Sequence, residues 1–398
     1  MNLTTQKRAL LAAGDVRGLL ALNRSLYGGA TMMARGYNAH ADLMRTTADG
    51  RDLDALFEEA RAAVDIANQQ QQNFLSLFSY QVTSPVVSVL QTVGGGSDIF
   101  EQASEYGVPQ GSRIKHDVLD MGATFRWYDA AWKATWRYLA DATEAEIVAN
   151  ASAIINADEE KVFKEVMSTV FRHTNRSVTD DRTNTTYNVF AFANGDGWVP
   201  PKYAGQSFAG THTHFRTTGA NTINSGDLDE IVDDFKSHGY SQENGTQIVI
   251  FVNASEGNVI NGFRVANGAR ADFIPSSGQR FFATDGDLVG QQVPATFAGF
   301  PVKGSYDEAI IIESARIPAG YVTALASGGA LANSNPIMFR VHPKFPGLTL
   351  VQGNRGDYPL IDSYWSHGFG TGIRHRLAGM VMQVTSNPSY TPPALYVA

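Results

Sequence analysis

The sequence predicts an α+β fold, in which long helices, a two-stranded ribbon and a compact helix-and-strand domain follow one another along the chain. Residues 53–64 repeat apolar side chains at helical spacing. A second apolar repeat begins behind the capping-box pair Thr143 and Glu146 and continues for about 28 residues, on the order of 40 Å. A capped helix that starts near Ser225 is followed at once by the apolar segment TQIVIFVNA, which is typical of a compact domain of helices and strands.

Length and composition define the broad class of protein. The 398 residues are enough for two or three domains, and 43% hydrophobic with 18% charged residues indicates a globular protein with much uncharged surface. A net charge of −8 disfavours a chain that wraps nucleic acid, because such binding needs clustered Lys and Arg. The absence of cysteine excludes disulfides, thiolate zinc sites and cysteine nucleophiles. No apolar run approaches the roughly 20 residues that cross a bilayer.

Two segments are predicted to depend on other copies of the chain for their order. Residues 1–50 form an arm whose apolar residues are too sparse for a core of their own. Residues 81–128 form a long two-stranded ribbon with a glycine-rich tip, and an isolated ribbon is only marginally stable in water. We therefore expect the ribbon to lie across another subunit. Residues 188–218 form a further extended excursion, rich in glycine and threonine.

Known catalytic motifs are missing from the sequence. No GxxxxGK phosphate loop, GxSxG nucleophile elbow or HExxH zinc motif occurs. The sequence therefore gives no support to a phosphate-loop enzyme, a serine hydrolase or a zinc protease of the HExxH type, and an enzymatic function is disfavoured. The Asp-Gly-Asp at 285–287 and the Asn-Gly-Asp-Gly at 194–197 are interpreted as turns, because neither continues into a calcium-binding loop. The aromatic segment FRWYDAAWKATWRYL alternates like a strand and lacks basic neighbours, which favours packing at the base of the ribbon over stacking on nucleic acid.

A pair of histidines could serve as metal ligands. His212 and His214 are two residues apart, a spacing that can present both imidazoles on one face of a strand. Because no third ligand stands near them in the sequence, we favour two polar residues in an exposed or interfacial strand over a metal site. Four acidic residues of the helix after Ser225 are expected on its solvated face without a catalytic role: Asp229, Glu230, Asp233 and Asp234.

The stretch YWSHGFGTGIRHR combines alternate glycines with a basic run: Gly368, Gly370, Gly372, then Arg374, His375 and Arg376. A dinucleotide-binding loop is excluded, because a helix would have to follow and a strand is predicted instead. We predict a glycine-rich turn that acts as a hinge and contact segment, because glycine tolerates positive φ angles and close backbone approach. For the basic run, pairing with carboxylates at an interface is favoured over contact with DNA phosphate.

The order of these segments resembles the HK97-like major capsid proteins of tailed bacteriophages. The most specific similarity lies in AGFPVKGSYDEAIIIESARIPAGYVTALA, FRVHPKFPGLTL and PLIDSYWSHGFGTGIRHRLAGMVMQV. The resemblance implies six segments: an N-arm (1–50), a P-domain helix (51–80), an E-loop (81–128), a P-domain with spine helix and excursion (129–222), an A-domain (223–365), and a closing P-domain strand with a tail (366–398).

The resemblance also implies roles for single residues. His375 and Arg376 would open the closing strand, and Arg340 and His342 would lie on a strand that leads into the A-domain. The candidates for intersubunit contact or hinge motion are Arg340, His342, Gly368, Gly370, Gly372, Arg374, His375 and Arg376. No catalytic, cofactor-binding or metal-binding residue is assigned. Only Lys115 stands in the ribbon, on its descending limb, so a shell without covalent Lys–Asn cross-links is expected.

The implied function is that of a structural, non-enzymatic major capsid protein. Copies of the chain would assemble into hexamers and pentamers of an icosahedral shell around double-stranded DNA, within the virion and in the host cytoplasm during assembly. Expected partners are other copies, a separate scaffolding protein, a portal and weakly contacted DNA, without a membrane; a decoration protein is left open. Two alternatives stay open: an encapsulin-like shell that stores an enzyme cargo, and a β-rich carbohydrate-binding protein suggested by the aromatic and Asp/Asn/Gly-rich loops.

Overall fold

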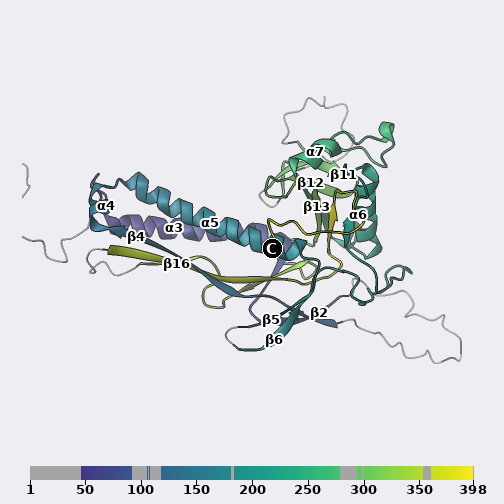
Figure 1. Ribbon diagram of the computed structural model, residues 1–398, viewed down its shortest axis with the longest axis horizontal. Helices are drawn as coiled ribbons and strands as arrows, with labels where there is room; N and C mark the ends of the chain where they lie inside the picture. The colour runs from purple at the N-terminus through teal and green to yellow at the C-terminus, as the bar shows by residue number, and fades with distance from the viewer. Residues whose placement is uncertain are drawn as a thin grey trace, which may run out of the picture.

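The computed structural model describes residues 46–91, 105, 107, 118–180, 183–277, 294–297, 300–352 and 360–397. Most of the predicted arm, the tip of the predicted ribbon with Lys115, and the sequence at 285–287 lie outside the described residues. Figure 1 shows two parts of the subunit. The elongated lobe contains helices α3 to α5 with strands β1, β4 and β14 to β16, and the compact lobe contains α6, α7 and the remaining large sheet, whose bounds follow.

Helix α3 (Leu53–Phe78) runs along the elongated lobe and was predicted from its apolar stripe. The carboxylate of Asp52 accepts the N–H of Asp54 and so caps the first turn. The stripe buries Leu53, Leu56 and, further along, Val64. A short helix, α4 (Trp136–Asp141), closes the far end of the lobe. Helix α3 therefore covers one side of the elongated lobe with a narrow apolar face.

Helix α5 (Glu144–Phe171) is the predicted spine and lies beside α3 (Figure 1). Its 28 residues begin with the predicted capping box of Thr143 and Glu146. Its buried side chains all fall in the second half, from Val162 onward, while the first half has none. His367 of strand β16 holds the helix through a 2.7 Å bond between its Nδ1 and Asp158. The first half of the spine helix is therefore less buried against the rest of the subunit than the second half.

The elongated lobe is built on a five-stranded sheet around one long strand, β16. The strands are β1 (Ser79–Val82), β4 (Arg126–Thr135), β14 (Ile337–Val341), β15 (Thr349–Gln352) and β16 (Leu360–Ile373). One edge of β16 pairs with β4 from Leu360 to Phe369, and its other edge pairs with β15 and then β14. The sheet therefore joins segments that are more than 200 residues apart in the sequence.

Two small antiparallel sheets lie at the base of the ribbon. Strands β2 (Val86–Leu90) and β3 (Val118–Gly122) pair as the two-stranded ribbon that the sequence predicts. Strands β5 (Arg176–Thr179) and β6 (Thr186–Val189) form the second pair. The two sheets touch at Gly122, where a Cβ atom would overlap the backbone of β6, so only glycine permits this approach.

The compact lobe is built on an eight-stranded sheet. Its strands are β7 (Phe215–Thr217), β8 (Gln247–Val252), β9 (Ile274–Pro275), β10 (Thr296–Phe297), β11 (Phe300–Tyr306), β12 (Ala309–Glu313), β13 (Tyr321–Ser327) and β17 (Gly379–Gln383). Helices α6 (Ser225–Ser237) and α7 (Ala254–Ile260) and the 3-10 turns η3 (Gln242–Asn244) and η4 (Val265–Asn267) accompany it. The predicted helix and apolar strand after Ser225 are α6 and β8.

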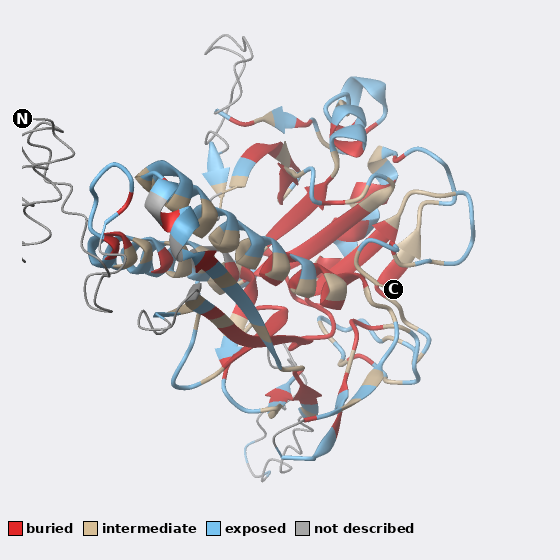
Figure 2. Cartoon of the chain, turned by 60° about the vertical axis from the view of Figure 1, so that its left-hand side comes forward, coloured by how far each residue is buried: buried red, intermediate tan, exposed pale blue. Residues whose placement is uncertain are grey.

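Strand β8 shows how the two lobes share one subunit. Its residues 248–252 are all buried, as the red strands of Figure 2 illustrate. Ile248 and Ile250 face a core under α6, whereas Val249 and Phe251 face a second core that contains residues of both lobes. The ring of Phe251 packs 5.5 Å from that of Phe78 at the end of α3. The two lobes therefore share one hydrophobic core and are not independent domains.

The pairing of the C-terminal strands differs from the expectation. Strands β14 and β15 and the first six residues of β16 fall within the predicted A-domain segment 223–365, yet they pair in the sheet of the elongated lobe. Strand β17, predicted to close the P-domain, joins the eight-stranded sheet beside β13. Local patterns reveal that strands exist but carry no information about such distant partners.

The predicted glycine-rich turn at Gly368, Gly370 and Gly372 is wrong, because all three glycines lie within the extended strand β16. Their spacing of two places them on one face of the strand. On that face the backbone between β3 and β4 lies so close that a Cβ on Gly370 would overlap the carbonyl of Thr124. Thr371 and Thr124 also exchange backbone and hydroxyl hydrogen bonds of 3.1 Å. The predicted close backbone approach is present, without positive φ angles.

We expect Gly370→Ala to destabilise the subunit by about 3 kcal/mol or more, because the new methyl group meets backbone that no side-chain rotation can move aside. The measurement is thermal unfolding of the purified chain, with soluble yield as a second readout. Gly262→Ala is the control, since a Cβ there meets only one carbonyl, at 3.3 Å. Equal melting temperatures for the two variants would contradict the close approach.

Candidate functional site

The basic run after β16 forms a junction between the two sheets. We call residues 374–378 the junction, because they connect β16 of one sheet to β17 of the other. The backbone N–H groups of Arg374 and His375 both donate to the carbonyl of Pro336, at 2.7 and 3.3 Å. The junction is therefore a tight crossing held by backbone bonds.

Arg376 is the most connected side chain of the junction and is 1% exposed. Its Nε donates to Ala191 O at 3.0 Å, and its Nη2 donates to Asn194 Oδ1 at 3.0 Å and to Asp196 Oδ2 at 2.9 Å. Its backbone N–H donates to the side-chain oxygen of Gln91, at the base of the ribbon, at 3.0 Å. One residue therefore joins the ribbon base and the excursion to the compact lobe.

The charge of Arg376 is balanced within the chain. Burial tends to raise the pKa of Asp196, but hydrogen bonds from Arg376 and Asn175 outweigh burial and lower it. The guanidinium also lies 4.8 Å over the ring of Trp198. Asp196 belongs to the predicted turn at 194–197, in which Gly195 and Gly197 adopt positive φ angles. The carboxylate partner predicted for the basic run exists, but in the same subunit.

Arg374 and His375 bind a loop of their own chain. The guanidinium of Arg374 donates to the backbone and side-chain oxygens of Asn333 at 3.1 and 3.0 Å and lies 4.1 Å over the ring of Tyr80. His375 Nε2 contacts the same backbone carbonyl, and burial lowers the pKa of His375 to about 4, so the ring is neutral near pH 7. Both side chains are less than a tenth exposed, which does not suit binding to DNA phosphate.

Arg340 forms a second buried ion pair. It lies on β14, and its Nη2 is 2.6 Å from Asp180 Oδ2, with side chains that are 6% and 4% exposed. Its Nη1 donates to the hydroxyl of Tyr187 at 3.3 Å. His342 follows the strand, accepts the N–H of Lys344 at Nδ1 and packs its ring on neighbouring aromatic rings. The strand predicted to lead into the A-domain is thus fastened to the base of the ribbon.

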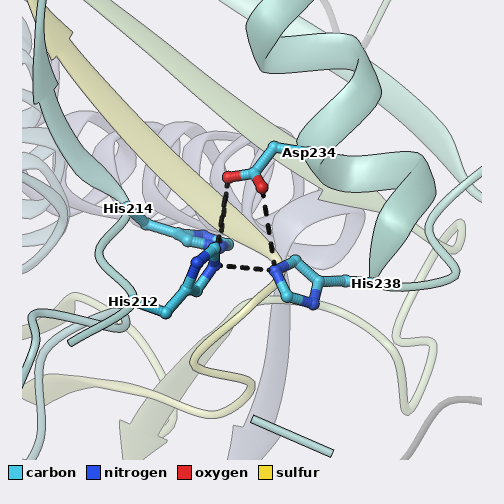
Figure 3. Close-up of side chains that lie close together, drawn as sticks. All are labelled: His212, His214, Asp234 and His238. Atoms are coloured by element: carbon cyan, nitrogen blue, oxygen red, sulfur yellow. Dashed lines mark hydrogen bonds and ion pairs between the residues drawn. The ribbon is translucent and has the colours of Figure 1, made fainter. Parts of the chain in front are cut away.

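A third cluster gathers polar side chains in the compact lobe. His212 and His214 precede β7, in a loop rather than in the predicted strand. Asp234 lies on α6, and His238 caps its C-terminus. Figure 3 shows the four side chains pointing toward one another. One ligand atom from each lies within 4.8 Å of the others.

The electrostatics of this histidine cluster are dominated by burial. Burial lowers the pKa of His212 to about 4 and that of His238 to about 3, and it lowers the pKa of the fully enclosed His214 as well. The three imidazoles are therefore neutral near pH 7. Burial raises the pKa of Asp234 to about 6, although Arg216, which donates to its Oδ2 at 2.9 Å, acts in the opposite direction.

Two sequence-based expectations about this region are wrong. Further side chains that could bind a metal do lie near His212 and His214 in space, because α6 brings His238 and Asp234 beside them. Asp234 is 11% exposed, so it does not lie on the solvated face of its helix, unlike Asp233 at 60%. The spacing of four residues between Asp234 and His238, which places both on one helix face, was the available signal.

Among the described parts of the chain, no helix combines the length and the apolar character needed to span a membrane.

Similarity to known proteins was found among solved structures. No protein-family model and no curated protein matches the sequence. A chain from Mycobacterium phage Patience has 35% sequence identity and a TM-score of 0.65 over 92% of this chain and 98% of its own length. The mature capsid of bacteriophage PhiM1 is more distant, with 11% identity, a TM-score of 0.46 and 79% and 87% coverage. An encapsulin complex from Synechococcus elongatus has 12% identity, a TM-score of 0.41 and 81% and 90% coverage.

The spine helix, the two-stranded ribbon and the two-lobed arrangement define a shell-forming subunit of the HK97 type. The chain belongs to the HK97-fold major capsid proteins of tailed bacteriophages, and it assembles with copies of itself into the capsid shell of the virion. The fold class and the function predicted from the sequence are thereby confirmed, and the similarity favours a phage capsid over the encapsulin alternative.

The buried ion pair leads to a stability prediction. We expect Asp180→Asn to destabilise the subunit by about 3 kcal/mol, because Arg340 would keep a buried charge without its partner. Replacing both residues, Asp180→Leu with Arg340→Met, is expected to cost less than the single change, because no charge then stays buried. Chemical denaturation of the purified chain measures both differences.

The control is Glu58→Gln on α3, which breaks an ion pair with Arg61 whose side chains are 57% and 68% exposed. Exposed pairs contribute little, so this change should shift stability by less than about 1 kcal/mol. A double variant less stable than Asp180→Asn would contradict the buried-charge explanation.

Proposed function

We propose that the chain acts as a purely structural subunit, without enzymatic activity, whose copies form hexamers and pentamers around double-stranded DNA. The P-domain of this subunit is the five-stranded sheet with α3 and α5, and its A-domain is the eight-stranded sheet with α6 and α7. The family resemblance and the separation into two large sheets support this division.

The observation that carries the proposal is the long edge strand β4. Ten residues of β4 pair with β16 along one edge, and no other described strand pairs with the opposite edge. Only Ala134 of these ten residues is buried. A long exposed edge can pair with other chains and is normally covered or interrupted in a monomer. We infer that another copy of the subunit covers the unpaired edge of β4.

Apolar side chains are also exposed along the elongated lobe. Seven large ones are at least 40% exposed: Ile66, Trp127, Tyr138, Val148, Phe345, Val351 and Tyr364. An open apolar groove lies between α3, α4, α5 and the sheet, lined by residues such as Leu56, Phe57, Leu139, Ile147 and Leu350. Single exposed apolar residues are ordinary, but an apolar groove beside them favours an interface with neighbouring subunits.

Further partners follow from the family resemblance. We propose that the arm (1–50) and the E-loop (81–128) lie on neighbouring subunits, and that a separate scaffolding protein and a portal take part in assembly in the host cytoplasm. The shell is locked without covalent bonds. Because Arg374 and Arg376 bind groups of their own chain, weak contact with DNA is assigned to other side chains. Hinge motion at Gly368 to Gly372 stays a prediction.

Assembly of the purified chain tests the proposal. We expect electron microscopy to reveal closed shells, and mature particles to give a single 43.1 kDa band on a denaturing gel. Ala131→Glu adds a charge to the exposed part of β4 without entering the core, so it should reduce shell yield at least about tenfold while the melting temperature of the subunit stays unchanged.

Three results would contradict the proposal. The first is a stable monomer that stays unassembled at high concentration even when the scaffolding protein is supplied. The second is a normal shell yield for Ala131→Glu. The third is a ladder of multiples of the subunit mass, which would mean covalent cross-links. Particles that co-purify with an enzyme cargo instead of DNA would favour the storage-shell alternative.

A further inference from the structure

The histidine cluster has the composition of a transition-metal site. Three imidazole nitrogens and one carboxylate converge from two separate parts of the chain (Figure 3). Imidazole and carboxylate ligands suit zinc, and four protein ligands are typical of structural rather than catalytic zinc sites. All four side chains are at most 13% exposed, so water does not solvate them freely.

The distances agree with one ion held between the four groups. His212 Nε2 lies 3.1 Å from His214 Nε2 and 2.8 Å from His238 Nε2. The carboxylate oxygens of Asp234 lie 3.6 to 4.0 Å from the same three nitrogens. Ligands at about 2.0–2.1 Å from a tetrahedral zinc stand roughly 3.3 Å apart, in the middle of these values. The carboxylate contacts are too long for hydrogen bonds.

Without an ion, the protons of the three imidazoles cannot be placed well. His214 Nδ1 is 2.8 Å from the carbonyl of Gly379, which only accepts, so Nδ1 carries the proton and Nε2 of the neutral ring is a lone pair. A proton on His212 Nε2 would have to be shared between two acceptors, Nε2 of His214 and Nε2 of His238. A proton on His238 Nε2 would leave the lone pairs of His212 and His214 facing each other at 3.1 Å. A cation that accepts all three lone pairs removes this conflict.

The surroundings of the cluster orient the ligands. The bond from His214 to Gly379 fixes both its tautomer and its ring, as is usual for metal-binding histidines. Arg216 holds Oδ2 of Asp234 and also pairs with Glu230, so its positive charge is shared by two carboxylates. No described group pairs with Nδ1 of His238, and its Nε2 is the ring nitrogen that points into the cluster, 2.8 Å from His212 Nε2. The ring of Phe208 covers the imidazoles of His212 and His238.

We propose that His212, His214, Asp234 and His238 bind one zinc ion as a closed structural site. The site fastens the excursion, which carries His212 and His214, to α6 of the compact lobe. It is independent of the assembly mechanism, because all its ligands come from one subunit.

Metal analysis of shells of the full-length chain tests the proposal. Shells produced in zinc-containing medium should contain about one zinc per chain. Removal of the metal with EDTA, followed by addition of Zn²⁺ alone, should restore that content and raise the melting temperature by roughly 5 °C or more. Co²⁺ in place of zinc should give the intense visible absorption of a tetrahedral ion.

Variants separate this site from adventitious binding. His212→Ala and His238→Ala should each lower the zinc content to below about a tenth of an equivalent and abolish the zinc-dependent rise in melting temperature. Asp233→Asn, on the same helix but 60% exposed, is the matched control and should keep both. The wild-type measurements decide the proposal even if a variant fails to fold.

Wild-type shells that contain no zinc and take up neither Zn²⁺ nor Co²⁺ after EDTA treatment would overturn the proposal. So would a folded double variant, His212→Ala with His238→Ala, that retains a full equivalent of zinc. Shell formation is scored on the same samples, so the loss of the metal site is distinguished from the loss of assembly.

Discussion

The buried guanidinium of Arg376 is the contact on which the rest of the subunit depends. Strand β16 belongs to one sheet and β17 to the other, and only the junction between them separates the two. At this point Arg376 reaches the excursion through Asn194 and Asp196 and the ribbon base through Gln91. A charge that is 1% exposed is stable only with all its partners in place, so these segments must be correctly placed together.

The elongated lobe extends from this junction and leaves much of β4 and the first half of α5 exposed. Strand β16 carries β4 along one edge, and the glycines of β16 let the backbone before β4 lie directly on the strand. The far ends of β4 and α5, by contrast, are largely exposed. The same subunit therefore combines a centre held by many buried hydrogen bonds with a largely exposed periphery, and this combination suits a protein whose final partners are copies of itself.

Local sequence patterns predicted the helices, because caps and apolar spacing within the segment itself determine where a helix forms. The capping box of Thr143 and Glu146 marked the start of α5, and the apolar spacing of residues 53–64 indicated α3. Strand β16 was mistaken for a turn because glycine suggested flexibility, although a spacing of two is the period of a strand. The partners of β16, and the approach of α6 to His212, depend on pairings between distant segments that no single-sequence pattern contains.

Hydrogen exchange of the Arg376→Met variant tests the central claim most directly. If Arg376 couples the two sheets, its loss should lower amide protection about tenfold or more in three separate segments at once: 86–91, 191–198 and 379–383. Mass spectrometry of peptides from the wild type and the variant measures this difference. A loss of protection confined to the residues next to Arg376, with the ribbon base and the excursion unchanged, would contradict the account.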